Sequence, residues 1–98
     1  MTRTAAITSE DRAAMIAQTI IDAASARISL VVTPTASLTI FSVSPAVASG
    51  SYLSVAVRDR SVRVSRVMAG GSTSGSASFE GLAADIVADA VVAMASAL

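Results

Sequence analysis

Four arginines within nine residues are the part of this sequence best suited to chemistry. Arg58, Arg60, Arg63 and Arg66 are four of the seven arginines in the chain. A guanidinium group presents a planar set of donors that fits phosphate or carboxylate, so the cluster predicts an anion-binding surface on a β-hairpin. The alternative is that these arginines solubilise an apolar hairpin, protect a strand edge, and pair with acids of the turn or of a neighbouring subunit.

A glycine- and serine-rich segment, residues 69–78, follows the arginines. Its composition predicts a flexible link. Gly70, Gly71 and Ser72 can offer backbone amides to an anion if the segment meets the arginines in space. The segment has neither a Walker nor a dinucleotide-binding glycine pattern, and the chain has no lysine. We therefore expect a link here, with ligand binding as the alternative.

Residues for catalysis and metal binding are sparse. The chain contains no His, Cys, Lys, Asn or Trp, which excludes disulfides, thiolate nucleophiles, Schiff-base lysines and ordinary zinc sites. No serine lies in a Gly-x-Ser-x-Gly elbow. The acidic pairs, Glu10 with Asp11 and Asp85 with Asp89, lack a third ligand at a suitable spacing. We expect a protein without enzyme activity, metal or cofactor.

The composition predicts one small folded domain spanning residues 1–98. Of these residues 53% are hydrophobic and 14% charged, a balance typical of folded chains. The formal net charge is zero, so nucleic acid and anionic membranes are disfavoured as partners. Only three residues are aromatic, and alanine and valine dominate the apolar set, which favours stabilisation by a second subunit.

The ends of the chain give expectations about location and source. Ser9, Glu10 and Asp11 interrupt any signal-peptide core, and no apolar run is long enough to span a membrane. We expect a cytoplasmic protein or a component of an assembled phage particle. The alanine-rich, lysine-free composition is typical of a GC-rich genome such as that of an actinobacterium or its phages.

Two amphipathic segments predict helices at either end of the chain. Residues 8–26 begin with Thr8 as a cap and Asp11 in the capping-box position. Their apolar residues recur at three-four spacing: Ala13, Ile16, Ala17, Ile20 and Ala24. The second predicted helix starts at the cap Ser78 and continues to Leu98. Its expected apolar stripe is Phe79, Leu82, Ala83, Ile86, Val87, Ala90, Val91, Met94 and Leu98.

Between the helices the pattern predicts two β-hairpins joined by residues 44–51. Residues 28–33 and 37–43 flank a tight turn at Pro34-Thr35, and both faces of this hairpin carry large apolar groups. Residues 52–58 and 61–68 close around Asp59-Arg60, where a four-residue loop is favoured because the turn lacks glycine. This register places five residues on one core face: Leu53, Val55, Val57, Val62 and Val64.

The predicted architecture is α+β, with a helix, a four-stranded antiparallel meander and a second helix, both helices packed on one sheet face. Open sheet edges and the doubly apolar first hairpin favour a homo-oligomer that extends or stacks the sheet. The favoured function is a non-enzymatic, homo-oligomeric protein that acts through its surfaces in assembly or protein-protein interaction. The alternative is a module that binds an anionic, nucleotide-like ligand at a subunit interface.

Overall fold

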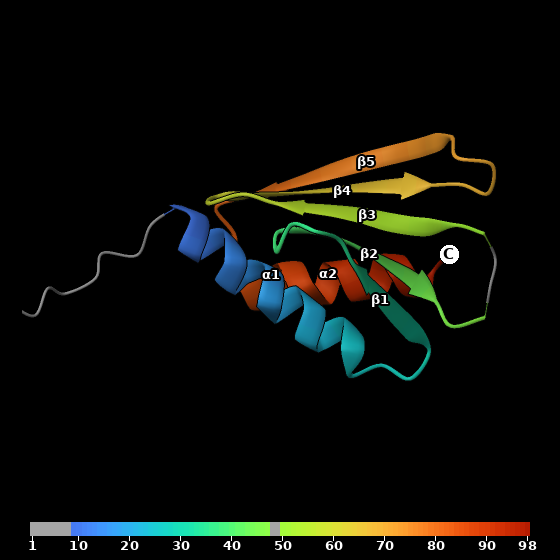
Figure 1. The fold of residues 1–98 in the computed structure, drawn as a ribbon, viewed down its shortest axis with the longest axis horizontal. Helices are drawn as coiled ribbons and strands as arrows, with labels where there is room; N and C mark the ends of the chain where they lie inside the picture. Colours follow the sequence, from blue (N-terminus) through green and yellow to red (C-terminus); the bar gives the residue numbers. More distant parts are fainter. Residues whose placement is uncertain (1–8, 48–49) are drawn as a thin grey trace, which may run out of the picture.

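Two helices and five antiparallel strands make up the part of the chain that the structure, a computed structural model, describes: residues 9–47 and 50–98. The strands form one sheet in chain order, a simple meander (Figure 1). The elements are α1 (Ser9–Ser25), β1 (Leu30–Pro34), β2 (Ile40–Pro45), β3 (Tyr52–Val57), β4 (Ser61–Val67), β5 (Thr73–Glu80) and α2 (Ala84–Ser96). The α+β class is confirmed, and the four-stranded sheet is corrected to five strands.

The hairpin of β3 and β4 has the predicted register. Val55 lies opposite Val64, and Val57 lies opposite Val62. Strict alternation along both strands sends every second residue into the core, because successive side chains point to opposite faces. The N–H of Arg58 donates to the carbonyl oxygen of Ser61 (2.7 Å) and closes the turn. No described non-glycine residue has a positive φ, so the turn is not of a primed type.

The first hairpin has the predicted faces but a wider loop. Val32 pairs with Val43 and Pro34 with Phe41, so residues 35–39 form the loop in place of a tight turn at Pro34-Thr35. Thr35 stabilises this loop, since its hydroxyl donates to the carbonyl oxygen of Ile40 (2.6 Å). The register moves by an even number of residues, so each side chain keeps its predicted face. Ile28, predicted as the first residue of the strand, precedes β1 and is fully exposed.

The fifth strand replaces a predicted link and helix start. Serines at 74, 76 and 78 alternate with Gly75, Ala77 and Phe79, and this period of two lets the segment pair with β4 along its whole length. Ser78 therefore lies in a strand and does not cap a helix. The ladder is regular from Ser61–Glu80 to Arg66–Gly75 and shifts by one residue at Val67, which pairs with Thr73.

The second helix is shorter than the sequence predicts. It begins at Ala84, after an extended Ala83 whose side chain makes no capping hydrogen bond. Phe79, Leu82 and Ala83 thus lie outside it, and Ile86 is more than half exposed. Its buried residues are Val87, Ala88, Val91, Val92 and Ala95, while Asp85 and Asp89 are exposed as expected.

Both helices pack on the same face of the sheet, as predicted. Helix α1 contacts α2, β1 and β3, and α2 also contacts β2 and β3; in Figure 1 both helices lie beneath the sheet, away from β5. Helix α1 buries Ala13, Ala17, Ile20 and Ala24, with Ile16 partly covered. Its predicted cap, Thr8, lies outside the described residues. Among the described residues the core is entirely apolar.

Candidate functional site

The sheet face opposite the helices carries a continuous row of hydroxyl groups. One hydroxyl residue on each strand lies directly opposite the next: Thr33, Ser42, Ser54, Ser65 and Ser76. These residues alternate with the core positions of the same strands, so their side chains point away from the helices. All five are partly or fully exposed. The row makes this face uncharged across its middle.

Apolar side chains flank the hydroxyl row on the same face. Val31 is 46% exposed and Ile40 is 44% exposed, although valine and isoleucine are favoured inside proteins. Tyr52 and Val67 lie opposite each other on β3 and β4, with the Tyr52 side chain also exposed. The predicted apolar character of both faces of the first hairpin is thus present, with Val31 and Ile40 left at the surface.

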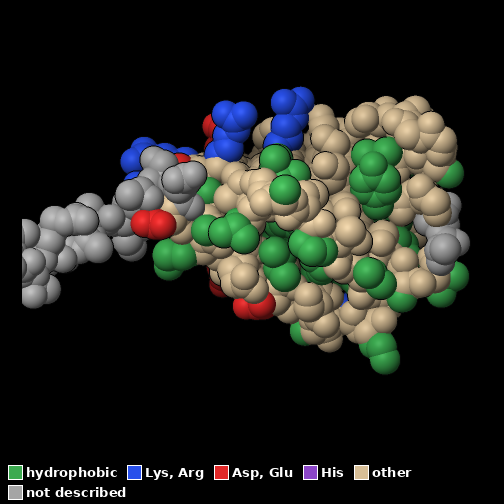
Figure 2. Space-filling view, in the orientation of Figure 1, with side chains coloured by type: hydrophobic (Ala, Val, Ile, Leu, Met, Phe, Trp, Pro, Cys, Tyr) green, Lys and Arg blue, Asp and Glu red, His purple; other side chains and the backbone are tan. Residues whose placement is uncertain are grey.

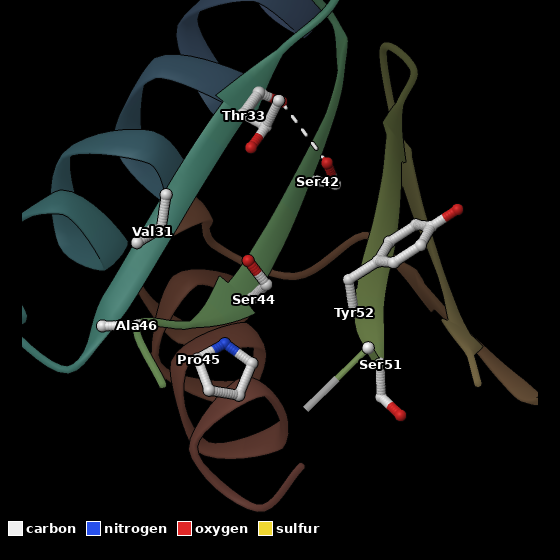
Figure 3. A pocket seen from close by; sticks show the side chains of 9 residues that line it. Val31, Thr33, Ser42, Ser44, Pro45, Ala46, Ser51 and Tyr52 are labelled. Atoms are coloured by element: carbon white, nitrogen blue, oxygen red, sulfur yellow. Dashed lines mark hydrogen bonds between the residues drawn. The ribbon is translucent and has the colours of Figure 1, made fainter. Parts of the chain in front are cut away.

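A hollow of about 390 Å³ lies over β1, β2 and the start of β3. Figure 3 shows side chains of all three strands around it, with the Tyr52 ring on the β3 side. Ser42 makes a long contact of 3.5 Å from its hydroxyl to the carbonyl oxygen of Thr33. The lining holds hydroxyl and small apolar groups and no charged residue: Val31, Thr33, Ser42, Ser44, Pro45, Ala46, Gly50, Ser51 and Tyr52. It therefore offers an anion no counter-charge.

The arginine cluster is divided among three places. Arg58 and Arg60 lie in the turn between β3 and β4. Arg63 pairs with Ala56 and Ser78, so its side chain lies on the sheet face away from the helices. Arg66 points to the helix side, because it lies opposite Leu53 and Gly75. The sheet alternation that the sequence predicted therefore keeps the four guanidinium groups from converging on one ligand.

Asp59, in the turn between β3 and β4, pairs with Arg12, a residue that sequence analysis did not single out. Arg12 of α1 forms an ion pair with Asp59, at a side-chain exposure of 48% and 24%. Arg58, Arg60 and Arg63 are exposed. Figure 2 shows the charged side chains of the visible face mostly toward the end where α1 begins, with the opposite half almost uncharged.

The glycine-serine segment does not join the turn arginines. Gly70, Gly71 and Ser72 lie in the turn between β4 and β5, whereas Arg58 and Arg60 lie at the other end of β4. A seven-residue strand spans roughly 20 Å, so one small anion cannot touch both groups. Gly70 and Gly71 have φ values of 96° and 93°, and the carbonyl oxygen of Met68 accepts a hydrogen bond from the N–H of Gly71 (2.9 Å). These glycines form a turn in which left-handed backbone is required.

Strand β5 is a long exposed edge of the sheet. It has eight residues, most of them exposed, with Glu80 as its one charged side chain and no proline. The other edge, β1, is five residues long, ends in Pro34 and lies against α1. Short strands, proline and a covering helix protect an edge from pairing with another chain. The edge of β5 has none of these protections.

A second hollow, of about 290 Å³, lies beside this edge on the helix side. Its walls come from β3, β4, β5 and the end of α2, and its lining residues are Leu53, Arg66, Gly75, Ser76, Ala77, Met94 and Ala97. A side chain added at Gly75 would meet nothing within 4 Å. Sequence reasoning missed both hollows and the β5 edge. The available signal was the alternation of residues 73–80, which their linker-like composition obscured.

The described residues hold neither a metal-binding cluster nor a membrane-spanning helix. No group of three or more acidic side chains within residues 9–47 and 50–98 is placed to hold a metal ion. In the same part of the chain, neither helix is long and apolar enough to cross a membrane.

Comparison with known proteins adds no relative. The sequence matches no protein-family model, and no curated protein or solved structure matches it significantly.

Proposed function

We propose that this protein is a non-catalytic, homo-oligomeric building block that acts through its surfaces in assembly. One observation carries the proposal: both helices cover the same face of the sheet, so the described chain exposes the other face and the β5 edge. Val31, Ile40 and Tyr52 are exposed on that face, and β5 presents its backbone along eight residues. Unpaired edges and exposed apolar groups on a sheet are the features that a second chain covers.

The charge distribution supports association between like chains. Half of the surface in Figure 2 is almost without charge, so two copies can approach there without burying unpaired ionic groups. A core built mainly of valine and alanine contributes modest stability to a single chain. Assembly in the cytoplasm or in a phage particle remains our proposal for the setting, and it rests on composition and size.

Native mass spectrometry of the freshly purified protein tests the proposal. We expect a mass that is an integral multiple of the chain mass, with nothing else attached. A monomer at every concentration would contradict the assembly function. An excess mass that disappears on denaturation would favour ligand binding instead, and its value would identify the ligand class.

A second candidate function is binding of an anion at the turn of β3 and β4. The supporting observation is that Arg58, Arg60 and Arg63 are exposed at or near this turn, and that Asp59, the acid of the turn, pairs with Arg12. This candidate no longer includes Gly70, Gly71 and Ser72, because they lie at the opposite end of β4. Arg66 is also separate, because it faces the helix side.

Calorimetric titration with pyrophosphate tests the second candidate. If the turn binds anions, the double variant Arg58→Ala, Arg63→Ala loses the heat of binding, and Arg27→Ala, next to α1, keeps it. If neither the native protein nor the variants bind pyrophosphate at low salt, the candidate fails. If the double variant instead dissociates an oligomer, these arginines are interface groups.

A further inference from the structure

The geometry points to the second copy of this chain as the partner of the β5 edge: two β5 strands pair antiparallel about a two-fold axis and join two sheets into one of ten strands. This inference rests on the proposed assembly function and goes further, because it names the interface, the register and the residues that meet. Three independent features of the described chain support it.

The first feature is the edge itself. Every second residue of an edge strand directs its N–H and C=O away from the sheet, and these groups gain partners when another strand pairs with them. Strand β5 is regular from Gly75 to Glu80. Its outer side is accessible to a partner, with Ser74, Ser76 and Ser78 all exposed. An antiparallel copy of the same strand can pair along this entire length.

The second feature is the register that the two sheet faces impose. A two-fold axis perpendicular to the sheet keeps both helix layers on one side, so helix-side residues must lie opposite helix-side residues. Placing the axis beside Ala77 pairs residues 75–79 of the two copies, and it leaves outside Ser74, which has no partner in β4, and the shifted pair at Thr73. In this register Ala77 meets the partner's Ala77, and Phe79 meets the partner's Gly75.

The third feature is a hollow beside Gly75, which can receive the Phe79 side chain of the second copy. Phe79 points to the helix side, since it lies opposite Val62, and it is only partly buried in its own chain. The partner's Gly75 has no Cβ, and open space surrounds it at the hollow of about 290 Å³ lined by Met94 and Leu53. An aromatic ring crosses over a glycine on a neighbouring strand because no side chain stands in its way. Each copy thus supplies a ring and receives one.

Charge does not oppose this register. Glu80 is the one charged residue of β5, and it falls beside the partner's Ser74 at the end of the paired segment. Pairing of the two β5 strands therefore places no like charges directly opposite each other.

Single cysteines test the register directly, because the native chain has none. Opposed residues of an antiparallel pair are about 4.5–5.5 Å apart at Cα, which suits a disulfide. We expect Ala77→Cys to form a disulfide-linked dimer under mild oxidation at least about tenfold faster than Ala36→Cys in the exposed first hairpin loop, because pairing raises the local concentration of the thiol. Ser76→Cys alone is expected to cross-link as slowly as Ala36→Cys. An equimolar mixture of Ser76→Cys and Ser78→Cys chains is expected to cross-link fast, because these two positions lie opposite each other in the proposed register.

The outcomes separate this inference from the proposed function. A native chain that stays monomeric up to about 500 µM would overturn both. If the chain is oligomeric but Ala77→Cys reacts no faster than Ala36→Cys, and the mixed pair also fails, the β5 interface is wrong while assembly stands. Fast cross-linking of Ser76→Cys alone would overturn the register. The mixed pair provides a second test if Ala77→Cys does not fold, which circular dichroism shows.

Discussion

Arg66 and Ser74 are joined by a hydrogen bond from Nε to Oγ of 2.8 Å, beside the one irregular pair in the ladder of β4 and β5. The bond holds a cationic side chain at the exposed edge of the sheet. In the proposed dimer this hydrogen bond lies at the end of the paired segment of the two β5 strands. The relationship connects a local feature of one hairpin to the way in which two chains meet.

Gly75→Val should change fold stability and association in opposite directions. A β-branched residue replaces a glycine whose added side chain meets nothing within 4 Å, so the free energy of unfolding should rise by about 0.5–1 kcal/mol. The valine occupies the space over which the partner's Phe79 ring lies, so dimerisation should weaken about tenfold. Urea unfolding and sedimentation give the two quantities. Gly75→Ala is the matched control with a smaller effect on association, and an unchanged dimer in both variants would contradict the proposed ring contact.

Comparing alanine substitutions at Gly50 and Gly70 separates the cost of backbone strain from the cost of a steric clash. Both have positive φ, 78° and 96° respectively. A Cβ at Gly50 would lie 2.9 Å from Ala69 Cβ, whereas one at Gly70 would meet nothing within 4 Å. Each substitution by alanine costs about 1 kcal/mol in strain, and Gly50→Ala should cost more because of the contact. Equal losses of unfolding free energy in the two variants would refute the clash.

Phe41 should dominate the stability of the core. It is the largest side chain that is fully buried, at 1% exposure, and it lies between Pro34 and Val55 in the sheet. Phe41→Ala should lower the unfolding free energy by about 3–5 kcal/mol, a large fraction of the total for a domain of this size. Leu38→Ala, at a residue that is 80% exposed, should change it by less than about 0.5 kcal/mol. Similar losses for both would place the core elsewhere.

Sequence analysis predicted the β3–β4 hairpin and α1 because apolar residues recur there at the spacing of a strand or a helix. Val55, Val57, Val62 and Val64 alternate with small or polar residues, and their register followed directly from this pattern. Ile20 and Ala17 likewise predicted the buried face of α1. These predictions hold because burial of large side chains fixes both the period and the face.

The prediction failed where small residues carry the pattern. Residues 73–80 alternate with the period of a strand, but glycine, serine and alanine are also typical of linkers, and pairing with β4 decides between the two. The apolar periodicity from Phe79 onward fits a helix equally well, although the helix begins at Ala84. The arginines were found by their spacing, and the alternation of the predicted hairpin already places Arg63 and Arg66 on opposite faces, as the structure confirms.

The most direct test of the central claim is sedimentation equilibrium of the native chain beside the edge variant Ser76→Lys, Ser78→Lys. Lysines on an edge strand block its pairing, and in the proposed register the new lysine at position 76 would face the one at position 78 of the second copy. We predict a reversible dimer for the native chain and a monomer for the variant, with the same unfolding midpoint at low protein concentration. A native chain that is monomeric throughout, or a variant that associates as strongly as the native chain, would contradict the claim.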